Sequence, residues 1–122
     1  MTNPSPLPRL TDIVEAIERI YKALGNISTF DDFKTDWQLQ WIVERGVEIV
    51  SEASRHLSVE LKERHPDIPW PKVAGIGNII RHDYENVSLP IMWRLLEEYL
   101  PALEKVCRHE LEVEIARRKT QQ

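Results

Sequence analysis

An arginine, a histidine and a tyrosine stand together in the stretch Arg81-His82-Asp83-Tyr84, which ends a mostly apolar segment. Histidine exchanges protons near neutral pH, and arginine can hold a phosphate and neutralise charge that builds up during phosphoryl transfer. Metal-free cleavage of RNA requires such groups: a base for the 2′-hydroxyl, a cation for the phosphorane and an acid for the leaving oxygen. RNA cleavage is therefore one interpretation of this stretch.

A structural interpretation of the same residues stands beside it. A histidine at the end of a helix more often interacts with the helix dipole or caps the helix, and short motifs of this kind also occur without chemistry. One histidine per chain supplies only half of the acid–base pair that the reaction needs. A symmetric dimer with two such helix ends face to face would supply both.

Other kinds of site have weaker support in the sequence. The histidines at 56, 65, 82 and 109 are not paired at the spacing of metal ligands on one helical face, so we expect neither a metal site nor a cofactor. Gly75-x-Gly77 is a poor match to a phosphate-binding loop. Cys107 is the one cysteine of the chain, which excludes an internal disulfide and favours a buried structural thiol.

Length and charge limit the class of protein. We expect 122 residues to form one domain, 1–122, and the net charge of −4 gives no general attraction to nucleic acid. An RNA site would therefore be a local patch. The candidates for a basic rim are Arg55, His56, Lys62, Arg64 and Lys72. The acids interspersed among them make a plain solvated surface an equal alternative.

The sequence also bears on location. No apolar run is long enough for a membrane span, and the start MTNPSPLPRL lacks the apolar core of a signal peptide. We therefore expect a soluble cytoplasmic protein.

Apolar residues recur at helical spacing through most of the chain. The pattern predicts a first helix over 10–24, stopped by Gly25, and a second from about Asp36, with a bend, towards Arg64. A third has Pro71 in its first turn and ends between 81 and 86. A fourth begins near Ser88 and is kinked or split by Pro101. Residues 1–8 are expected to be an extended lead-in, and residues 108–122 a charged, solvated helical tail.

Four helices with short connections predict an all-α, up-down four-helix bundle. Trp37 and Trp41 lie on another side of the second helix from its main apolar stripe. The second helix thus has more apolar surface than one small bundle needs, which favours a homodimer. A large monomeric core is the alternative, and Trp41 and Trp93 are expected in a core or an interface.

Several longer blocks match one family. They are DIVEAIERI, VEIVSEASRHL, LKERHPDIPWPKVAGIGNIIRHDY, the pattern V-x-L-x-x-x-W from Val87, and LPALE. The most specific is P-x-I-P-W followed by a glycine and then N-x-x-x-H-x-Y. On these residues the chain, from about Leu10 to Val106, resembles the HepT-like branch of the HEPN superfamily.

The resemblance implies a dimeric four-helix bundle in which two histidine motifs meet in a shared cleft. It implies a metal-independent ribonuclease toxin of a bacterial toxin–antitoxin pair, with RNA as substrate. The implied antitoxin is an MNT-type minimal nucleotidyltransferase, which in the family can transfer AMP to the tyrosine of H-x-Y. His82 would then be catalytic and Tyr84 the AMP acceptor; otherwise Tyr84 is a packing aromatic.

The motif departs from the family pattern at one position. The residue before Asn78 is Gly77, where the family commonly has arginine, and an arginine stands at 81 instead. Positions 77 and 81 share a helical face, so Arg81 could extend into the same space. Gly77 could let two subunits approach closely. Asn78 could orient His82 by a hydrogen bond or satisfy internal polarity.

Because the family arginine is absent at position 77, an alternative function stands beside RNA cleavage. In this alternative the protein binds its nucleotidyltransferase partner without cutting RNA.

Overall fold

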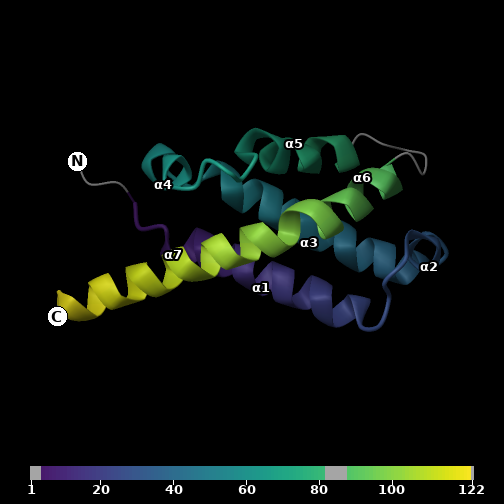
Figure 1. The fold of residues 1–122 in the computed structure, drawn as a ribbon, viewed down its shortest axis with the longest axis horizontal. Helices are drawn as coiled ribbons and strands as arrows, with labels where there is room; N and C mark the ends of the chain where they lie inside the picture. Colours follow the sequence, from purple (N-terminus) through teal and green to yellow (C-terminus); the bar gives the residue numbers. More distant parts are fainter. Residues whose placement is uncertain (1–3, 82–87, 122) are drawn as a thin grey trace.

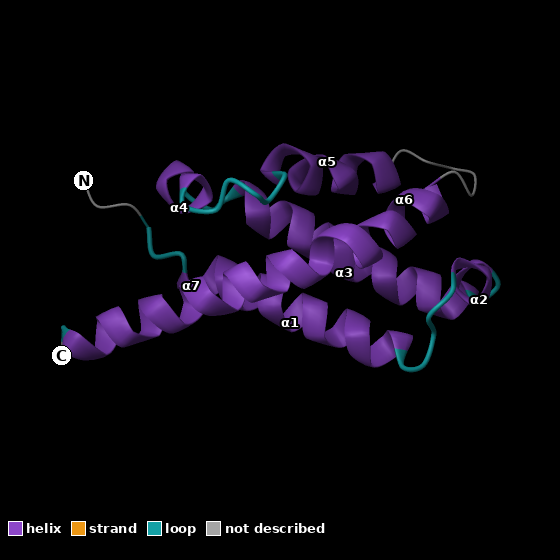
Figure 2. Ribbon diagram, in the orientation of Figure 1, coloured by secondary structure: helices purple, strands orange, loops and turns teal. Residues whose placement is uncertain are grey.

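The computed structural model describes residues 4–81 and 88–121, and all the regular structure in these ranges is helical (Figures 1 and 2). The elements in chain order are α1 (Leu7–Leu24), α2 (Phe30–Lys34), α3 (Trp37–Arg55), α4 (Val59–Glu63), α5 (Trp70–Arg81), α6 (Ser88–Arg94), the π-helical turn η1 (Leu95–Tyr99) and α7 (Leu100–Thr120). The predicted all-α class is confirmed.

Four helical segments make the bundle within the described residues. α3 lies between α1 and α5, and the continuous segment of α6, η1 and α7 crosses over them (Figure 1). Gly46 of α3 lies against Ile20 of α1, while Ser51 of α3 contacts Ala74 of α5. The apolar face of each helix is buried in one common core. This agrees with the predicted four-helix bundle.

The predicted stop of the first helix and the predicted start of the second are correct, although α1 begins at Leu7, three residues before the predicted start. Gly25 ends α1 with a φ of 54°, a conformation that favours glycine, and its N–H donates to the Tyr21 carbonyl. Asp36 begins α3, since its side chain accepts a hydrogen bond from the N–H of Leu39 at 3.0 Å. Local capping chemistry thus determines both boundaries.

The predicted continuation of the second helix towards Arg64 is wrong. α3 ends at Arg55, and the separate short helix α4 follows. Ser58 has extended backbone angles, and its side chain accepts from the N–H of Leu61, so it caps a new helix. The indole N–H of Trp70 donates to the carbonyls of Lys62 and His65, which fixes the turn that leads into α5.

Pro101 disturbs the last segment, as predicted. It cannot donate the backbone hydrogen bond that a helix requires at that position. The chain widens into the π-helical turn η1 immediately before it, where the N–H of Leu100 donates to the carbonyl of Leu95. α7 then continues regularly to Thr120.

Two aromatics of α2 close one end of the bundle. Phe33 is fully buried, with its ring centroid 5.3 Å from that of Trp93, and Phe30 lies 6.4 Å from the same indole. The other end differs from expectation, because Glu110 and Glu114 of the charged tail are buried rather than solvated. No helix in the described ranges is long and apolar enough to span a bilayer.

Candidate functional site

The candidate residues fall around the end of α5, partly outside the described ranges. Asn78 is exposed on α5, and Arg81 is the last described residue of that helix. His82 and Tyr84, predicted as the catalytic histidine and the modified tyrosine, lie outside the described residues. The structure therefore places the helix that leads to the motif.

α5 is held to α3 by an unusually close contact at Gly77. The glycine is buried, and a Cβ at this position would lie 2.7 Å from Oγ and 3.1 Å from Cβ of Ser51. Such a separation is below van der Waals contact, so a larger residue would require Ser51 to move. The close approach that Gly77 permits in the structure is therefore within one chain, to Ser51, and its role in bringing two subunits together stays a prediction.

Ser51 also bonds to the backbone of α5. Its hydroxyl donates to the Ala74 carbonyl at 2.7 Å and accepts from the N–H of Gly77 at 3.2 Å. The Nε and Nη2 atoms of Arg55 donate to the same carbonyl at 3.2 and 3.0 Å. These bonds join α3 to α5 about one turn before Asn78. They fix the direction from which the chain enters the motif.

Sequence reasoning missed Ser51. It lies among the apolar residues of α3 and is buried with its neighbour Ser54. A buried serine on a helix needs a hydrogen-bond partner. The position of Ser51 next to the apolar stripe of the helix could have indicated that it needs such a partner. The sequence could not have identified the carbonyl of Ala74 as the partner.

The predicted basic rim is largely occupied by contacts within the chain. Arg55 binds α5 and also lies 3.5 Å from Glu52, which His56 contacts at 3.0 Å. Burial lowers the pKa of Lys62. These contacts within the chain favour the alternative of a plain surface over a free cationic patch.

A second polar cluster joins α4 to α7. The buried Glu110 receives Arg64 Nη2 at 2.6 Å and pairs with His65 Nε2 at 2.7 Å. Burial acts to raise the pKa of Glu110, but its hydrogen bonds to Arg64 and His65 outweigh burial and hold the pKa below the ordinary value. One turn later, Glu114 contacts Arg117 at 2.9 Å and accepts from Ser5 at 3.2 Å.

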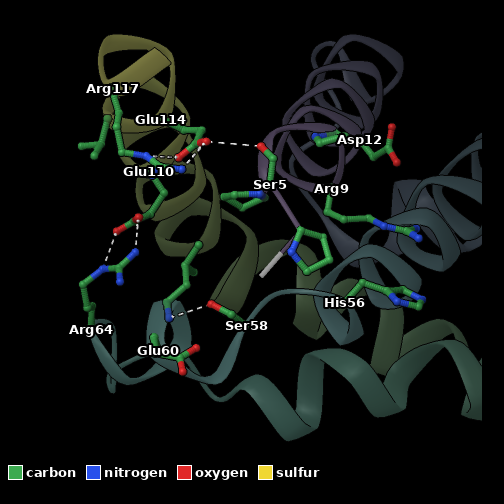
Figure 3. Close-up of a pocket in the computed structure, with 15 residues that line it drawn as sticks. Ser5, Arg9, Asp12, His56, Ser58, Glu60, Arg64, Glu110, Glu114 and Arg117 are labelled. Carbon is green, nitrogen blue, oxygen red and sulfur yellow. Dashed lines mark hydrogen bonds and ion pairs between the residues drawn. The ribbon is translucent and has the colours of Figure 1, made fainter. Parts of the chain in front are cut away.

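These two carboxylates line a cavity of about 1020 Å³ between the N-terminal segment, α4 and α7. Figure 3 shows Arg64 and Arg117 directed towards Glu110 and Glu114, with Arg9 and His56 on the opposite wall. Glu110 and Glu114 are thus each paired with an arginine of the same cavity. The cluster fastens the C-terminal helix to the rest of the bundle.

The remaining reactive groups have structural settings. Cys107 is buried, and burial with the nearby charge of Glu110 raises the pKa of its thiol to about 12. A thiolate is therefore disfavoured near neutral pH. No group of three or more His, Cys, Asp or Glu side chains in the described part of the chain is placed to hold a metal ion.

One known family matches the part of the chain that contains α5 and the motif. A family profile described as "Ribonuclease HepT-like" matches residues 13–110, from α1 into α7. The chain belongs to the HepT-like ribonuclease family. The match includes α5 and the segment from Asn78 to Tyr84, so the resemblance seen in the sequence is confirmed.

Similar proteins carry ribonuclease names. One from Thermococcus cleftensis, named "Probable ribonuclease HepT", is 37% identical over 94 residues, covering 77% of this chain and 84% of that protein. One from Caldanaerobacter subterraneus, with a provisional RNase name, is 33% identical over 110 residues, covering 90% of this chain and 97% of that protein. No solved structure gives a significant match.

Proposed function

We propose that this HepT-like protein is a metal-independent endoribonuclease that cuts RNA in a cleft shared by two copies of the chain. The observation that carries the proposal is the family match across α5 and the motif Asn78-x-x-x-His82-x-Tyr84. Two copies supply the two histidines that acid–base catalysis requires, since each chain has only one in the motif.

In the proposed reaction the 2′-oxygen of the RNA attacks the adjacent phosphorus, and the bond from phosphorus to the 5′-oxygen breaks. The histidine of one motif accepts the 2′-hydroxyl proton, and that of the other gives a proton to the leaving 5′-oxygen. Arg81 holds the phosphate and stabilises the charge of the phosphorane. Asn78, exposed on the turn before His82, orients the imidazole by a hydrogen bond.

The biological setting is also proposed from the family. The protein is a toxin whose antitoxin is an MNT-type nucleotidyltransferase, and that partner silences it by transferring AMP to Tyr84. An AMP group so close to His82 in sequence would add bulk and negative charge beside the phosphate-binding residues. It would therefore oppose the binding of RNA.

The test is cleavage of RNA by the purified protein in EDTA, without antitoxin, with intact mass used to show that Tyr84 is unmodified. Wild-type protein and His109→Ala, which changes an exposed histidine of α7, should cut equally. His82→Ala should lose at least about 100-fold in rate, the usual contribution of general acid–base catalysis. Equal cleavage by all three proteins would reject His82 as the catalytic group.

One observation favours a second candidate, a module that binds its nucleotidyltransferase partner without cutting RNA. Gly77 stands where the family commonly has arginine, and Ser51 occupies the space beside it. This candidate predicts no cleavage by any of the three proteins above, with partner binding intact. Co-purification with the nucleotidyltransferase would then be lost only on changes at the binding surface.

A further inference from the structure

An apolar groove lies between α1 and α3, on the flank of α3 opposite to α5. It has a volume of about 410 Å³, and its apolar lining consists of Ala16, Ile20, Trp41, Ile42, Gly46 and Ile49. Trp41 is 68% exposed and Ile42 is 49% exposed. Large apolar side chains gathered at one groove are typical of a protein-binding surface, whereas single ones are ordinary.

α1 and α3 pack closely where Gly46 and Ile20 line the groove. A Cβ at Gly46 would lie 2.6 Å from Cγ1 of Ile20, so glycine is needed for this approach. The ring of Trp41 meets that of Trp37 edge-on at a centroid distance of 5.2 Å. Trp37 is itself 59% exposed. The sequence correctly indicated a second apolar side of this helix.

Charged side chains border the groove, acidic ones towards the start of α1 and basic ones further along it. Asp12 and Glu15 precede Arg19 by one to two turns of α1. Arg45 adjoins Gly46, which faces Ile20, and so lies near the level of Arg19. One part of the groove is therefore acidic and the other basic. The ion pair of Arg45 with Glu48, at 3.6 Å, leaves the arginine 74% exposed.

This charge pattern complements itself. In a two-fold contact each surface meets its own copy in the opposite direction, so an acidic part faces a basic part twice. Tryptophan and arginine are also the residues that protein interfaces favour. RNA is a poorer occupant, because two acids and two bases give the groove no net attraction for a polyanion.

The geometry points to this groove as a self-association surface, in which a second copy of the chain binds across α1 and α3 about a two-fold axis. The inference goes beyond the proposed catalytic cleft, because α5 packs on the other flank of α3. If the α5 ends also pair, the chain has two self-association surfaces and forms an assembly larger than a dimer.

The test uses reversal of charge on one part of the groove at a time. Asp12→Arg with Glu15→Arg makes a wholly basic groove, and Arg19→Glu with Arg45→Glu makes a wholly acidic one. Each variant should repel its own copies, so its mass by light scattering should fall at least twofold relative to wild type. An equimolar mixture of the two variants should recover the wild-type mass.

The control is Val59→Glu, which adds a charge at a valine that is 64% exposed on α4, outside the groove. It should leave the mass unchanged, whereas Ile42→Glu in the groove should halve it. Thermal melting of each variant establishes that it is folded. The mass falls to that of a monomer, or to that of an α5-paired dimer if the α5 ends also pair, so failure of the ribonuclease proposal would be seen separately, in the cleavage assay.

A wild-type monomer, or variants that keep the wild-type mass, would overturn the inference. Variants that lose the mass without recovering it on mixing would overturn the two-fold arrangement. Unchanged mass combined with weaker RNA binding by Trp41→Ala would instead identify the groove as part of the RNA path.

Discussion

Oγ of Ser51 on α3 stands 2.7 Å from where a Cβ would lie on residue 77 of α5. The same hydroxyl accepts a hydrogen bond from the N–H of Gly77 and donates to the carbonyl of Ala74. Serine and glycine thus form one contact that positions the helix leading to His82. The glycine that departs from the family motif has a structural reason inside the chain.

Replacement of Gly77 by alanine should destabilise the fold. The added methyl group meets Ser51, and overpacking of this kind costs about 1–3 kcal/mol. Gly75→Ala is the matched control, because no atom beyond its chain neighbours and the backbone of its own helix lies within 4 Å of its Cβ position. This control should be neutral or stabilise the helix by up to about 1 kcal/mol. Urea unfolding of both variants measures the difference.

The cause can be checked by removal of the opposing side chain. Ser51→Gly takes away both atoms that the new methyl group meets. The double variant with Gly77→Ala should then lose less stability than the sum of the two single variants. Additive losses would show that the contact at position 77 is not what limits the size of the residue.

The sequence predicted those parts of the fold that depend on neighbouring residues. Gly25 and Asp36 cap their helices through residues within one turn, so the local sequence alone indicated where one helix stops and the next starts. The regular apolar spacing gave the faces that become the core. The irregularity near Pro101 could be predicted for the same reason, because a proline lacks the backbone N–H of a regular helix in any surroundings.

Contacts between distant residues could not be predicted. Nothing local shows that Ser51 meets Ala74, or that Glu110 is buried beside Arg64, because these pairs are 23 and 46 residues apart. Acids alternate with bases in the C-terminal segment, a pattern typical of a solvated helix. The motif itself was recognised from family resemblance, while the position of its helix came from the structure.

The pairing of Glu110 predicts a dependence of stability on pH. The pKa of Glu110 in the folded protein lies below its ordinary value of 4.5, so its contribution is fully present above that pH. The contribution is lost as pH falls below 4.5 through the folded pKa. Glu110→Gln should lower the free energy of unfolding at neutral pH by about 1–2 kcal/mol, a figure reduced by the exposure of Arg64.

Other carboxylates with lowered pKa values, including Glu52 and Glu114, contribute to the same trend. The informative quantity is therefore the difference between wild type and Glu110→Gln, which should shrink as pH falls below 4.5. Glu112→Gln changes an exposed acid of the same helix and should follow the wild-type curve. A difference that stays constant with pH would contradict the ionised pairing of Glu110.

Cys107 should be protected from thiol reagents in the folded protein. It is fully buried, and its pKa of about 12 leaves little thiolate. Mass spectrometry after brief alkylation at mildly alkaline pH should show no label until denaturant is added. Ala116→Cys places a thiol on an exposed part of α7 and should be labelled in the native state. Rapid labelling of native wild-type protein would show that this end of the bundle opens readily.

Phe33 should be the most costly aromatic to remove at the α2 end. It is fully buried against Trp93, and truncation to alanine leaves a cavity worth about 3–5 kcal/mol. Phe30→Ala is the paired comparison, because Phe30 contacts the same indole but is only partly buried. Thermal unfolding should show the larger drop for Phe33→Ala. Equal losses would indicate that α2 acts as a unit whichever ring is removed.

An arginine restored at position 77 decides between the two candidate functions once Ser51 is removed. Gly77→Arg alone meets the serine, so loss of activity could reflect a displaced α5. Ser51→Gly with Gly77→Arg relieves that contact. If Arg81 already serves the phosphate, the double variant should cut RNA no faster than Ser51→Gly alone, and Arg81→Ala should abolish cleavage. If the native protein is silent because the arginine is missing, cleavage should appear in the double variant and depend on His82.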